Sequence, residues 1–237
     1  MPDATICLPT YNERENLESM IRALAPLGVN VLVVDDNSPD GTGEIADRLA
    51  GELDFVSVLH RPEKQGLGPA YLAGFRRALA DGAEYILEMD CDFSHKPEDV
   101  PRLIAACESG ADLALGSRYI AGGGTENWGV TRRIISVGGS LYARVILGVN
   151  FHDLTGGFKC YRRAVLERID LDAIHSKGYA FQIETTYRTV RAGFKVVEVP
   201  ITFVDRTAGE SKMSRTIFLE AVKKVPALRY AAIRGKF

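Results

Sequence analysis

The chain has 237 residues, 46% of them hydrophobic and 25% charged, which is the composition of a folded globular protein long enough for one large α/β domain or two small ones. Its 29 basic and 31 acidic residues give a net charge of −2, so bulk charge does not support a dedicated nucleic-acid binder. The four cysteines are scattered without a CxxC pair, which indicates neither a zinc site nor a disulfide framework and favours reduced thiols in a cytosolic setting.

In the first half of the chain, short β-favouring runs alternate with segments of helical periodicity. Strands are expected at residues 4–9, 29–34, 55–60, 85–89 and 113–116. Helices are expected between them: one around residues 17–24 with Asn12 as its cap, one from about Thr42, one over 68–79 and one after Pro97. This alternation predicts an α/β fold with a doubly wound, mostly parallel sheet flanked by helices.

Ligands of such sheets bind beyond the carboxyl ends of the strands. Four segments of this chain should therefore meet along one rim, and they are residues 9–13, 35–40, 90–95 and 117–119. The candidate chemistry of the sequence falls in these segments.

The pattern changes after residue 120. An amphipathic helix is expected at about 131–147, a second helix at 179–191, and a last pair of strands around 196–204. No linker or internal repeat divides the chain, so we expect a single domain whose body is residues 1–212. Residues 213–237 form a basic amphipathic segment that either packs on the same domain or contacts a membrane surface.

A membrane-spanning segment is not expected. The beginning of the chain lacks the basic and apolar stretches of a secretory signal, and no uninterrupted apolar run approaches the roughly 18 residues that a spanning helix needs. We therefore expect a cytoplasmic protein, associated peripherally with the cytoplasmic face of a membrane or held there by a small membrane-anchoring partner protein.

The strongest local pattern is Asp90-Cys91-Asp92, directly after the strand at 85–89. Side chains two residues apart in extended backbone point to the same side, so both carboxylates can face one ion. Mg²⁺ characteristically takes one or two carboxylates and fills its other positions with phosphate and water, and Mn²⁺ accepts similar ligands. The alternative is a pair of loop or capping acids, but the position at the end of a central strand favours a metal.

Two other rim segments carry side chains suited to a nucleoside. Tyr11 could stack on a base and Glu13 could accept hydrogen bonds from guanine, although this segment alone is explained as well by a capped turn. Asp35 and Asp36 end the second strand, where an acid is well placed for ribose or base contacts. The loop that follows partly imitates a calcium loop, but a strand instead of a helix leads into it, so we reject calcium.

Basic side chains follow the rim in three separate segments. Arg118 follows the fifth strand, Arg132 lies at the start of the next helix, and Arg206 and Lys212 lie in a polar loop after the last strand. A single basic residue is usually solvated, but arginine and lysine converging from separate segments favour a shared anionic ligand. Of the four histidines only His95 lies near the acidic pair, where it is a candidate for local support.

Several motifs taken together resemble the polyprenol-phosphate mannosyltransferase branch of the inverting family 2 glycosyltransferases. In chain order they are LPTYNE, VVDDNSPDGT, LEMDCDFSHKPED, LGSRY, DLTGGFKCYRR, SKGYAFQIE and VPITFVDRTAGESKMS. The last of these is the most specific, because it distinguishes this branch from family 2 enzymes in general. The resemblance extends over nearly the whole chain and implies a GT-A fold with Mg²⁺ or Mn²⁺.

The resemblance also implies roles for individual residues. The nucleoside would be held by Pro9, Tyr11, Glu13, Val34 and Asp36. Asp90, Cys91 and Asp92 would surround the metal and the diphosphate, with Asp92 the principal ligand. Arg118, Arg206 and Lys212 would engage the phosphates and sugar of the donor, and Arg132 the phosphate of the acceptor. The chain departs from the pattern at Ser94, where relatives often have a glutamine that could ligate the metal, so Ser94 or a water would have to replace it.

The reaction implied is inverting transfer of mannose from GDP-mannose to a polyprenyl (dolichyl-type) phosphate. Because a phosphate monoester is mostly ionised at pH 7, with a second pKa near 6, such a reaction does not require a protein general base. Two alternatives stay open: a polyprenyl-phosphate glucosyltransferase that uses UDP-glucose, and a non-catalytic subunit that binds nucleotide sugars in a membrane complex.

Overall fold

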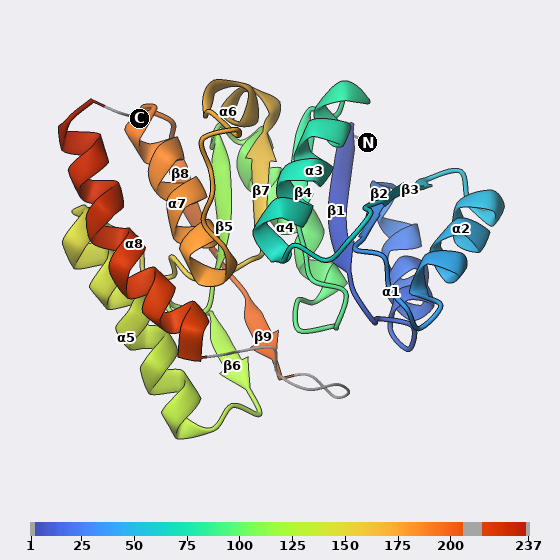
Figure 1. The fold of residues 1–237 in the computed structure, drawn as a ribbon, viewed down its shortest axis with the longest axis horizontal. Coiled ribbons are helices and arrows are strands. Elements are labelled where there is room, and N and C mark those ends of the chain that lie inside the picture. Colours follow the sequence, from blue (N-terminus) through green and yellow to red (C-terminus); the bar gives the residue numbers. More distant parts are fainter. Residues whose placement is uncertain (1–2, 206–214, 236–237) are drawn as a thin grey trace.

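The computed structural model describes residues 3–205 and 215–235, with side chains from residue 222 onward in the last stretch. Within these residues, seven strands form one sheet in the order β3-β2-β1-β4-β7-β5-β8 (Figure 1). The strands are β1 (Ala4–Thr10), β2 (Asn30–Asp35), β3 (Val56–His60), β4 (Tyr85–Glu88), β5 (Leu113–Ser117), β7 (Lys159–Arg162) and β8 (Val196–Pro200). A second, two-stranded sheet pairs β6 (Gly124–Glu126) with β9 (Thr202–Val204).

The predicted doubly wound sheet is confirmed. Strands β1 to β5 start and end within one residue of their predicted bounds. The pairings in the large sheet are parallel except those of β7, which runs antiparallel to both β4 and β5. Strands β6 and β7 were not predicted, and the expected final strand pair is wrong: β8 pairs with β5, and β9 leaves for the second sheet beside β6.

Helices cover both faces of the sheet. On one face α1 (Leu17–Leu24), α2 (Thr42–Glu52) and α4 (Val100–Glu108) share a core with alternate residues of the strands, among them Ile6 and Val33. On the other face α3 (Leu67–Ala80), α6 (Arg163–Arg168) and α7 (Gly178–Arg191) pack on Cys7 and Val34. The apolar run predicted at 29–34 is therefore buried on both faces, as parallel strands between two helical layers require.

A third core lies at the side of the molecule opposite the N-terminal helices. Helices α5 (Val130–Leu147) and α8 (Arg215–Ile233) lie side by side and pack on α7 (Figure 1). The packing brings Leu147, Ile183 and Val225 together. The α8 helix continues through Pro226, although proline usually limits a continuous helix. Among the described residues, no helix is long and apolar enough to cross a bilayer.

One local prediction is wrong. Asn12 does not cap α1, because that helix begins only at Leu17, after Asn16. Asn12 has a φ of 57°, in the left-handed region that Asn tolerates better than most residues, and its backbone N–H donates to the Ser38 hydroxyl at 3.1 Å. The segment after β1 is therefore a turn fastened to the loop after β2, which keeps residues 11–13 at the rim.

Candidate active site

At the ends of β1 and β2, the neighbouring aspartates Asp35 and Asp36 bind different partners. Asp35 accepts hydrogen bonds from the Thr10 hydroxyl at 3.0 Å and from the Ser38 hydroxyl at 2.6 Å. Asp36 forms an ion pair with Arg61, whose side chain is only 10% exposed. Burial raises the pKa of the Asp36 carboxyl, although Arg61 opposes this effect. Asp36 and Arg61 thus form a compact polar pair where a nucleoside was predicted.

Arg61 was not found by sequence reasoning. It directly follows β3, and its backbone N–H donates to the Asp35 carbonyl at 2.8 Å, so the rule about strand ends also applies to it. Lys64 was missed as well, and its ammonium lies 3.7 Å from the centre of the Tyr11 ring. The Glu13 carboxylate accepts a hydrogen bond from the Asn16 side chain at 3.0 Å. The rim at the ends of β1, β2 and β3 therefore contains more positive charge than the sequence indicated.

Two residues assigned to the nucleoside differ in what they can offer. Pro9 is half-buried at the end of β1, where its surface remains partly accessible. Val34 is fully buried, and its side chain belongs to the core under α3. The side chain of Val34 therefore offers no accessible surface to a nucleoside.

The acidic motif lies in a bent loop and not in extended backbone as predicted. Strand β4 ends at Glu88, residues 91–95 are bends, and Phe93 has a φ of 59°. Cys91, which the resemblance places around the metal and the diphosphate, is 3% exposed and packs in the hydrophobic core. Asp90 accepts a hydrogen bond from the Tyr71 hydroxyl at 3.3 Å. The side chains of the motif are thus divided between the rim and the core.

Ser94 and His95 support this loop from inside. The Ser94 hydroxyl donates to Asp92 Oδ1 at 2.6 Å, and the Ser94 N–H reaches the same oxygen at 3.1 Å. His95 is buried, stacks on Phe158 with ring centres 4.9 Å apart, and accepts the Asp90 N–H on Nδ1 at 3.3 Å. The support role expected of His95 agrees with this geometry. Ser94 is placed to orient Asp92.

The oxygen ligands that this loop offers fit a hard divalent cation. Asp90 and Asp92 offer carboxylate oxygens, and Mg²⁺ needs only one or two of these when phosphate and water complete its shell. Within residues 3–205 and 215–235 no group of three or more His, Cys, Asp and Glu residues is arranged around a common point. A metal here would therefore be held by the aspartate pair together with a substrate.

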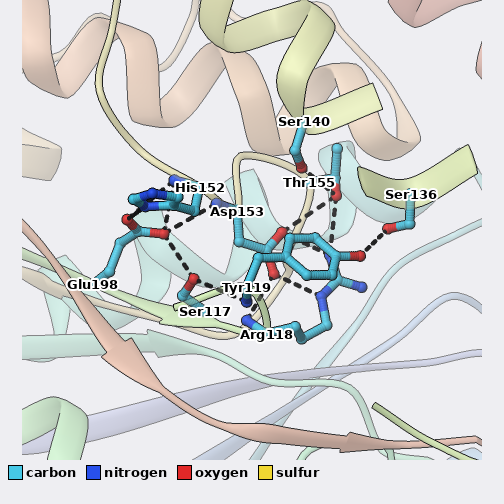
Figure 2. Close-up of polar contacts among 9 residues, drawn as sticks. All are labelled: Ser117, Arg118, Tyr119, Ser136, Ser140, His152, Asp153, Thr155 and Glu198. Atoms are coloured by element: carbon cyan, nitrogen blue, oxygen red, sulfur yellow. Dashed lines mark hydrogen bonds and ion pairs between the residues drawn. The ribbon is translucent and has the colours of Figure 1, made fainter. Parts of the chain in front are cut away.

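Arg118 is held by a buried carboxylate (Figure 2). Asp153 Oδ2 accepts both the Arg118 N–H at 3.0 Å and its Nε–H at 2.6 Å, while Oδ1 accepts from Nη2 at 2.7 Å. Burial opposes the charge of Arg118, but the facing carboxylate outweighs it and raises the pKa of the guanidinium. The pKa of Asp153 is in turn lowered, because Arg118 more than offsets the effect of burial. The pair is neutral as a unit, so Arg118 contributes directed hydrogen bonds more than net charge.

Arg132 is more accessible and has a different acidic partner. It contacts Asp205 at 2.5 Å, and its guanidinium lies 4.3 Å from the centre of the Trp128 ring. The side chains of Arg132 and Asp205 are 26% and 31% exposed. Arg206 and Lys212, the other predicted phosphate ligands, lie outside the described residues.

A cavity of about 440 Å³ opens beside Arg132, between α5, α7 and α8. Its lining is mostly apolar and includes Trp128, Ile135, Tyr142, Ile183, Val222 and Val225. Tyr179 also lines it, and the pKa of Tyr179 is raised by burial against the opposing charges of Arg118 and Arg132. The charge of Asp90 raises the pKa of Tyr179 further, so Tyr179 lies within electrostatic reach of the acidic loop and of both arginines. The cavity is therefore a mostly apolar space with a basic side chain, Arg132, in its lining.

A buried charge pair lies behind the acidic loop. Glu88 and Lys159 are directly opposite on β4 and β7, and both are at most 1% exposed. Lys159 donates to the Gln182 carbonyl at 2.8 Å and the Thr185 hydroxyl at 3.1 Å, while Tyr161 donates to Glu88 at 2.8 Å. Burial lowers the pKa of Lys159 to about 8, against the opposing charge of Glu88. This pair was not predicted, because nothing in either strand indicates the other as its partner.

Comparison with known proteins identifies the family. The pattern of the family described as Glycosyl transferase family 2 matches residues 5–170. The chain belongs to glycosyltransferase family 2. This glycosyltransferase is 52% identical over 223 residues to polyprenol monophosphomannose synthase of Mycolicibacterium smegmatis, covering 93% of this chain and 84% of the relative. It is also 52% identical over 235 residues to undecaprenyl-phosphate mannosyltransferase of Micrococcus luteus, covering 97% and 96%.

Solved structures confirm the GT-A type of fold. The glycosyltransferase superposes on glucosyl-3-phosphoglycerate synthase from Mycobacterium tuberculosis, in complex with Mn²⁺ and UDP-glucose, with a TM-score of 0.70. The sequence identity is 18%, and the match covers 97% of this chain and 79% of the other. At this identity the likeness concerns the arrangement of helices and strands.

Proposed function

We propose that the enzyme transfers mannose from GDP-mannose to a polyprenyl phosphate, with inversion at the anomeric carbon. The observation that carries this proposal is the mostly apolar cavity with the basic side chain of Arg132 in its lining. A lipid phosphate requires this combination, because its head is anionic and the rest of it is apolar. The names of the two relatives at 52% identity support the same acceptor and sugar.

The donor would lie along the ends of β1, β2 and β4. Tyr11 offers a ring for stacking, and a base placed there would replace the Lys64 ammonium that now covers it. Asp36, oriented by Arg61, and Glu13 offer acceptors for the ribose and for guanine. Pro9 and the backbone of Val34 would form the remaining contacts. These groups lie on strands or directly after strands that are fixed by the sheet, so donor binding requires little loss of conformational entropy.

Asp90 and Asp92 would hold Mg²⁺ or Mn²⁺, which when bound neutralises negative charge on the departing diphosphate. Ser94 fixes the orientation of Asp92 through two hydrogen bonds, which lowers the conformational entropy that metal binding would cost. Arg118 would direct hydrogen bonds at the donor, and Arg206 and Lys212 would add positive charge near its phosphates. Catalysis then rests on preorganised positioning and electrostatics.

The acceptor phosphate would bind at Arg132, with its polyprenyl chain in the cavity between α5, α7 and α8. To do so it would exchange with Asp205, which is partly exposed and already marks an anion position on this guanidinium. The attacking phosphate oxygen is mostly ionised at pH 7, since the second pKa of such a phosphate is near 6. The protein therefore has no proton to remove, and its residues act by aligning the oxygen with the anomeric carbon.

The surface around the cavity supports peripheral attachment to a membrane on its cytoplasmic face. Helix α5 exposes large apolar side chains, namely Val130, Ile134, Ile135, Val137, Leu141 and Val145. On α8, Val222, Tyr230 and Ile233 are also exposed. Such apolar area beside basic residues is typical of a helix that lies in the interface of an anionic bilayer. The cavity would then open where its lipid substrate is.

The test is transfer of labelled sugar to polyprenyl phosphate by the purified protein, with GDP-mannose, UDP-glucose and UDP-mannose as donors and with Mg²⁺, Mn²⁺ or EDTA. We expect transfer from GDP-mannose only, dependent on metal, with a β-linked product. Transfer from UDP-glucose instead would make the enzyme a glucosyltransferase. Binding of a nucleotide sugar without any transfer would contradict the proposal and indicate a non-catalytic subunit.

A further inference from the structure

Glu198, on β8, has an unusual concentration of hydrogen bonds for a residue that does not line the cavity (Figure 2). Its carboxylate accepts the backbone N–H groups of His152 and Asp153, both at 3.0 Å. It also accepts the Ser117 hydroxyl at 2.7 Å and lies 2.9 Å from His152 Nδ1. The side chain is 9% exposed. One carboxylate thus fastens β8 to the end of β5 and to the loop after α5.

The position of Arg118 depends on that loop. The Asp153 carboxylate accepts hydrogen bonds from the backbone N–H of Arg118 and from Nε and Nη2 of its guanidinium. Asp153 does not engage Nη1. The orientation of the Asp153 carboxylate follows from the path of its own backbone. Glu198 holds that backbone by accepting the Asp153 N–H. A change at Glu198 should therefore rotate or release the guanidinium without touching it.

The same cluster is attached to helix α5 (Figure 2). The Thr155 hydroxyl is 3.0 Å from Arg118 Nη2 and 3.3 Å from the Ser140 hydroxyl of α5. Tyr119 donates to the Ser136 hydroxyl, also on α5, at 2.7 Å. The helix that borders the cavity and the arginine of the donor side are therefore held by one set of hydrogen bonds.

We propose that Glu198 is a positioning residue for the transfer reaction. By fixing residues 152–153 it sets the Asp153 carboxylate, and through this carboxylate it aligns Arg118 with the reacting groups between donor and acceptor. This inference rests on the proposed function, since it assumes that Arg118 acts on the bound donor. It assigns Glu198 no contact with either substrate.

The test is the variant Glu198→Gln, whose amide nitrogen would face N–H donors that the carboxylate now satisfies. Because an ångström-scale misplacement of a reacting group can cost about 100-fold in rate, we expect kcat to fall about 10- to 100-fold. The KM for GDP-mannose and the Kd for GDP should stay within about twofold, since the nucleoside contacts lie on β1 and β2. Glu198→Asp, which keeps the charge on a shorter side chain, should recover part of kcat.

Two controls separate positioning from folding. Glu167→Gln changes an exposed acid that pairs with Arg163 on α6, and it should leave kcat unchanged. His152→Ala removes only the ring contact and keeps both backbone bonds to Glu198, so it should change kcat less than about threefold. Activity is expressed per folded molecule from thermal unfolding. If Glu198→Gln retains the wild-type kcat, or loses activity only in proportion to lost folded protein, the inference is wrong.

A readout without turnover keeps the inference distinct from the proposed function. The ¹H–¹⁵N resonance of Arg118 Nε, assigned by its absence in Arg118→Lys, reports directly on the bond to Asp153. We expect this resonance to shift or broaden in Glu198→Gln and to be unchanged in Glu167→Gln. An unchanged resonance in Glu198→Gln overturns the positioning role even if the wild-type enzyme transfers mannose. A wild-type protein that transfers no mannose overturns the proposed function alone, because the resonance still tests the link to Arg118.

Discussion

The residues proposed to bind the donor (the donor side) and those proposed to bind the acceptor (the acceptor side) are held by partners at different distances along the chain. On the donor side, Asp92 is bound by Ser94 two residues later, and Asp35 by Ser38 three residues later. Between the two sides, Arg118 pairs with Asp153, 35 residues away, and on the acceptor side Arg132 pairs with Asp205, 73 residues away. Local turns on the donor side are thus supplemented by contacts 25 residues apart, such as Asp36 with Arg61, whereas the pairs of Arg118 and Arg132 span 35 and 73 residues.

This difference has an electrostatic counterpart. Asp90 and Asp92 are the acids proposed to hold a cation, whereas Arg118 and Arg132 each form an ion pair with a carboxylate. In the proposed sites, the donor side offers acidic oxygens to a metal ion, whereas the two arginines would act by exchanging their carboxylate partner or by directed hydrogen bonds. Substitutions on the donor side should mainly reduce catalysis. Substitutions that break the ion pairs of Arg118 and Arg132 should mainly reduce stability.

The largest effect is expected at Asp92. Asp92→Ala removes the acid that Ser94 orients, and because the loss of a key electrostatic group costs about 100- to 1,000-fold, turnover should fall by at least that factor. Metal titration followed by transfer of labelled mannose measures it, with thermal unfolding as the control for folding. A histidine variant that is equally inactive with metal binding intact would contradict the assignment.

Lys159→Met tests the buried charges behind the loop. It leaves Glu88 buried without its cation, which should lower the free energy of unfolding by about 3–5 kcal/mol. Adding Glu88→Gln should recover a large part of that loss, because the remaining groups are then neutral. Urea unfolding gives both values, and Arg77→Met, which breaks an exposed pair with Asp81, should cost less than about 1 kcal/mol. Equal losses in the single and double variants would show that the charge pair is not the cause.

The acids of the two regions should respond to pH in opposite directions. The lowered pKa of Asp153 means that its contribution to stability is present above the unfolded pKa near 3.9 and is lost as pH falls through the folded value. The raised pKa of Asp36 means that its contribution is present at low pH and is lost as pH rises through the folded value.

Urea unfolding of Asp153→Asn and Asp36→Asn between pH 3 and 7 measures this contrast. The stability advantage of the wild type over Asp153→Asn should shrink as pH falls below about 4. Its advantage over Asp36→Asn should grow as pH falls from 7 toward 4. Parallel curves for the two variants would remove the electrostatic distinction between the regions.

The smallest effect on stability is expected on the exposed face of α5. Ile134 and Leu141 are 66% and 55% exposed, so changing both to Gln should alter the free energy of unfolding by no more than about 0.5 kcal/mol each. Leu147→Ala, on the buried face of the same helix, should cost about 2–5 kcal/mol. Sedimentation with anionic vesicles should show weaker binding of the Gln variant. Unchanged vesicle binding would count against α5 as the membrane contact.

The sequence predicted the strands that lead to the donor side because their signals are local, although it missed Arg61 and Lys64. Buried strands such as β2 and turns such as the one after Asp36 are encoded within a few residues, and the strand-end rule then gathered them on one rim. The acceptor side lacked such signals. Glu198 and Asp153 look like ordinary surface acids in the sequence, and Lys159 looks too polar for a buried strand. Only the sheet order brings each beside its partner.

The place of β7 constrains the order in which this chain can fold during synthesis. Strand β7 lies between β4 and β5 in the sheet, although β5 leaves the ribosome more than 40 residues earlier. Both earlier strands must keep an unpaired edge until residue 162 has emerged, and such edges are prone to wrong pairing. A nascent chain stalled before that point would expose one edge of β4 and both edges of β5, since β8 follows β7 in the chain, and recognition by chaperones would be most needed there.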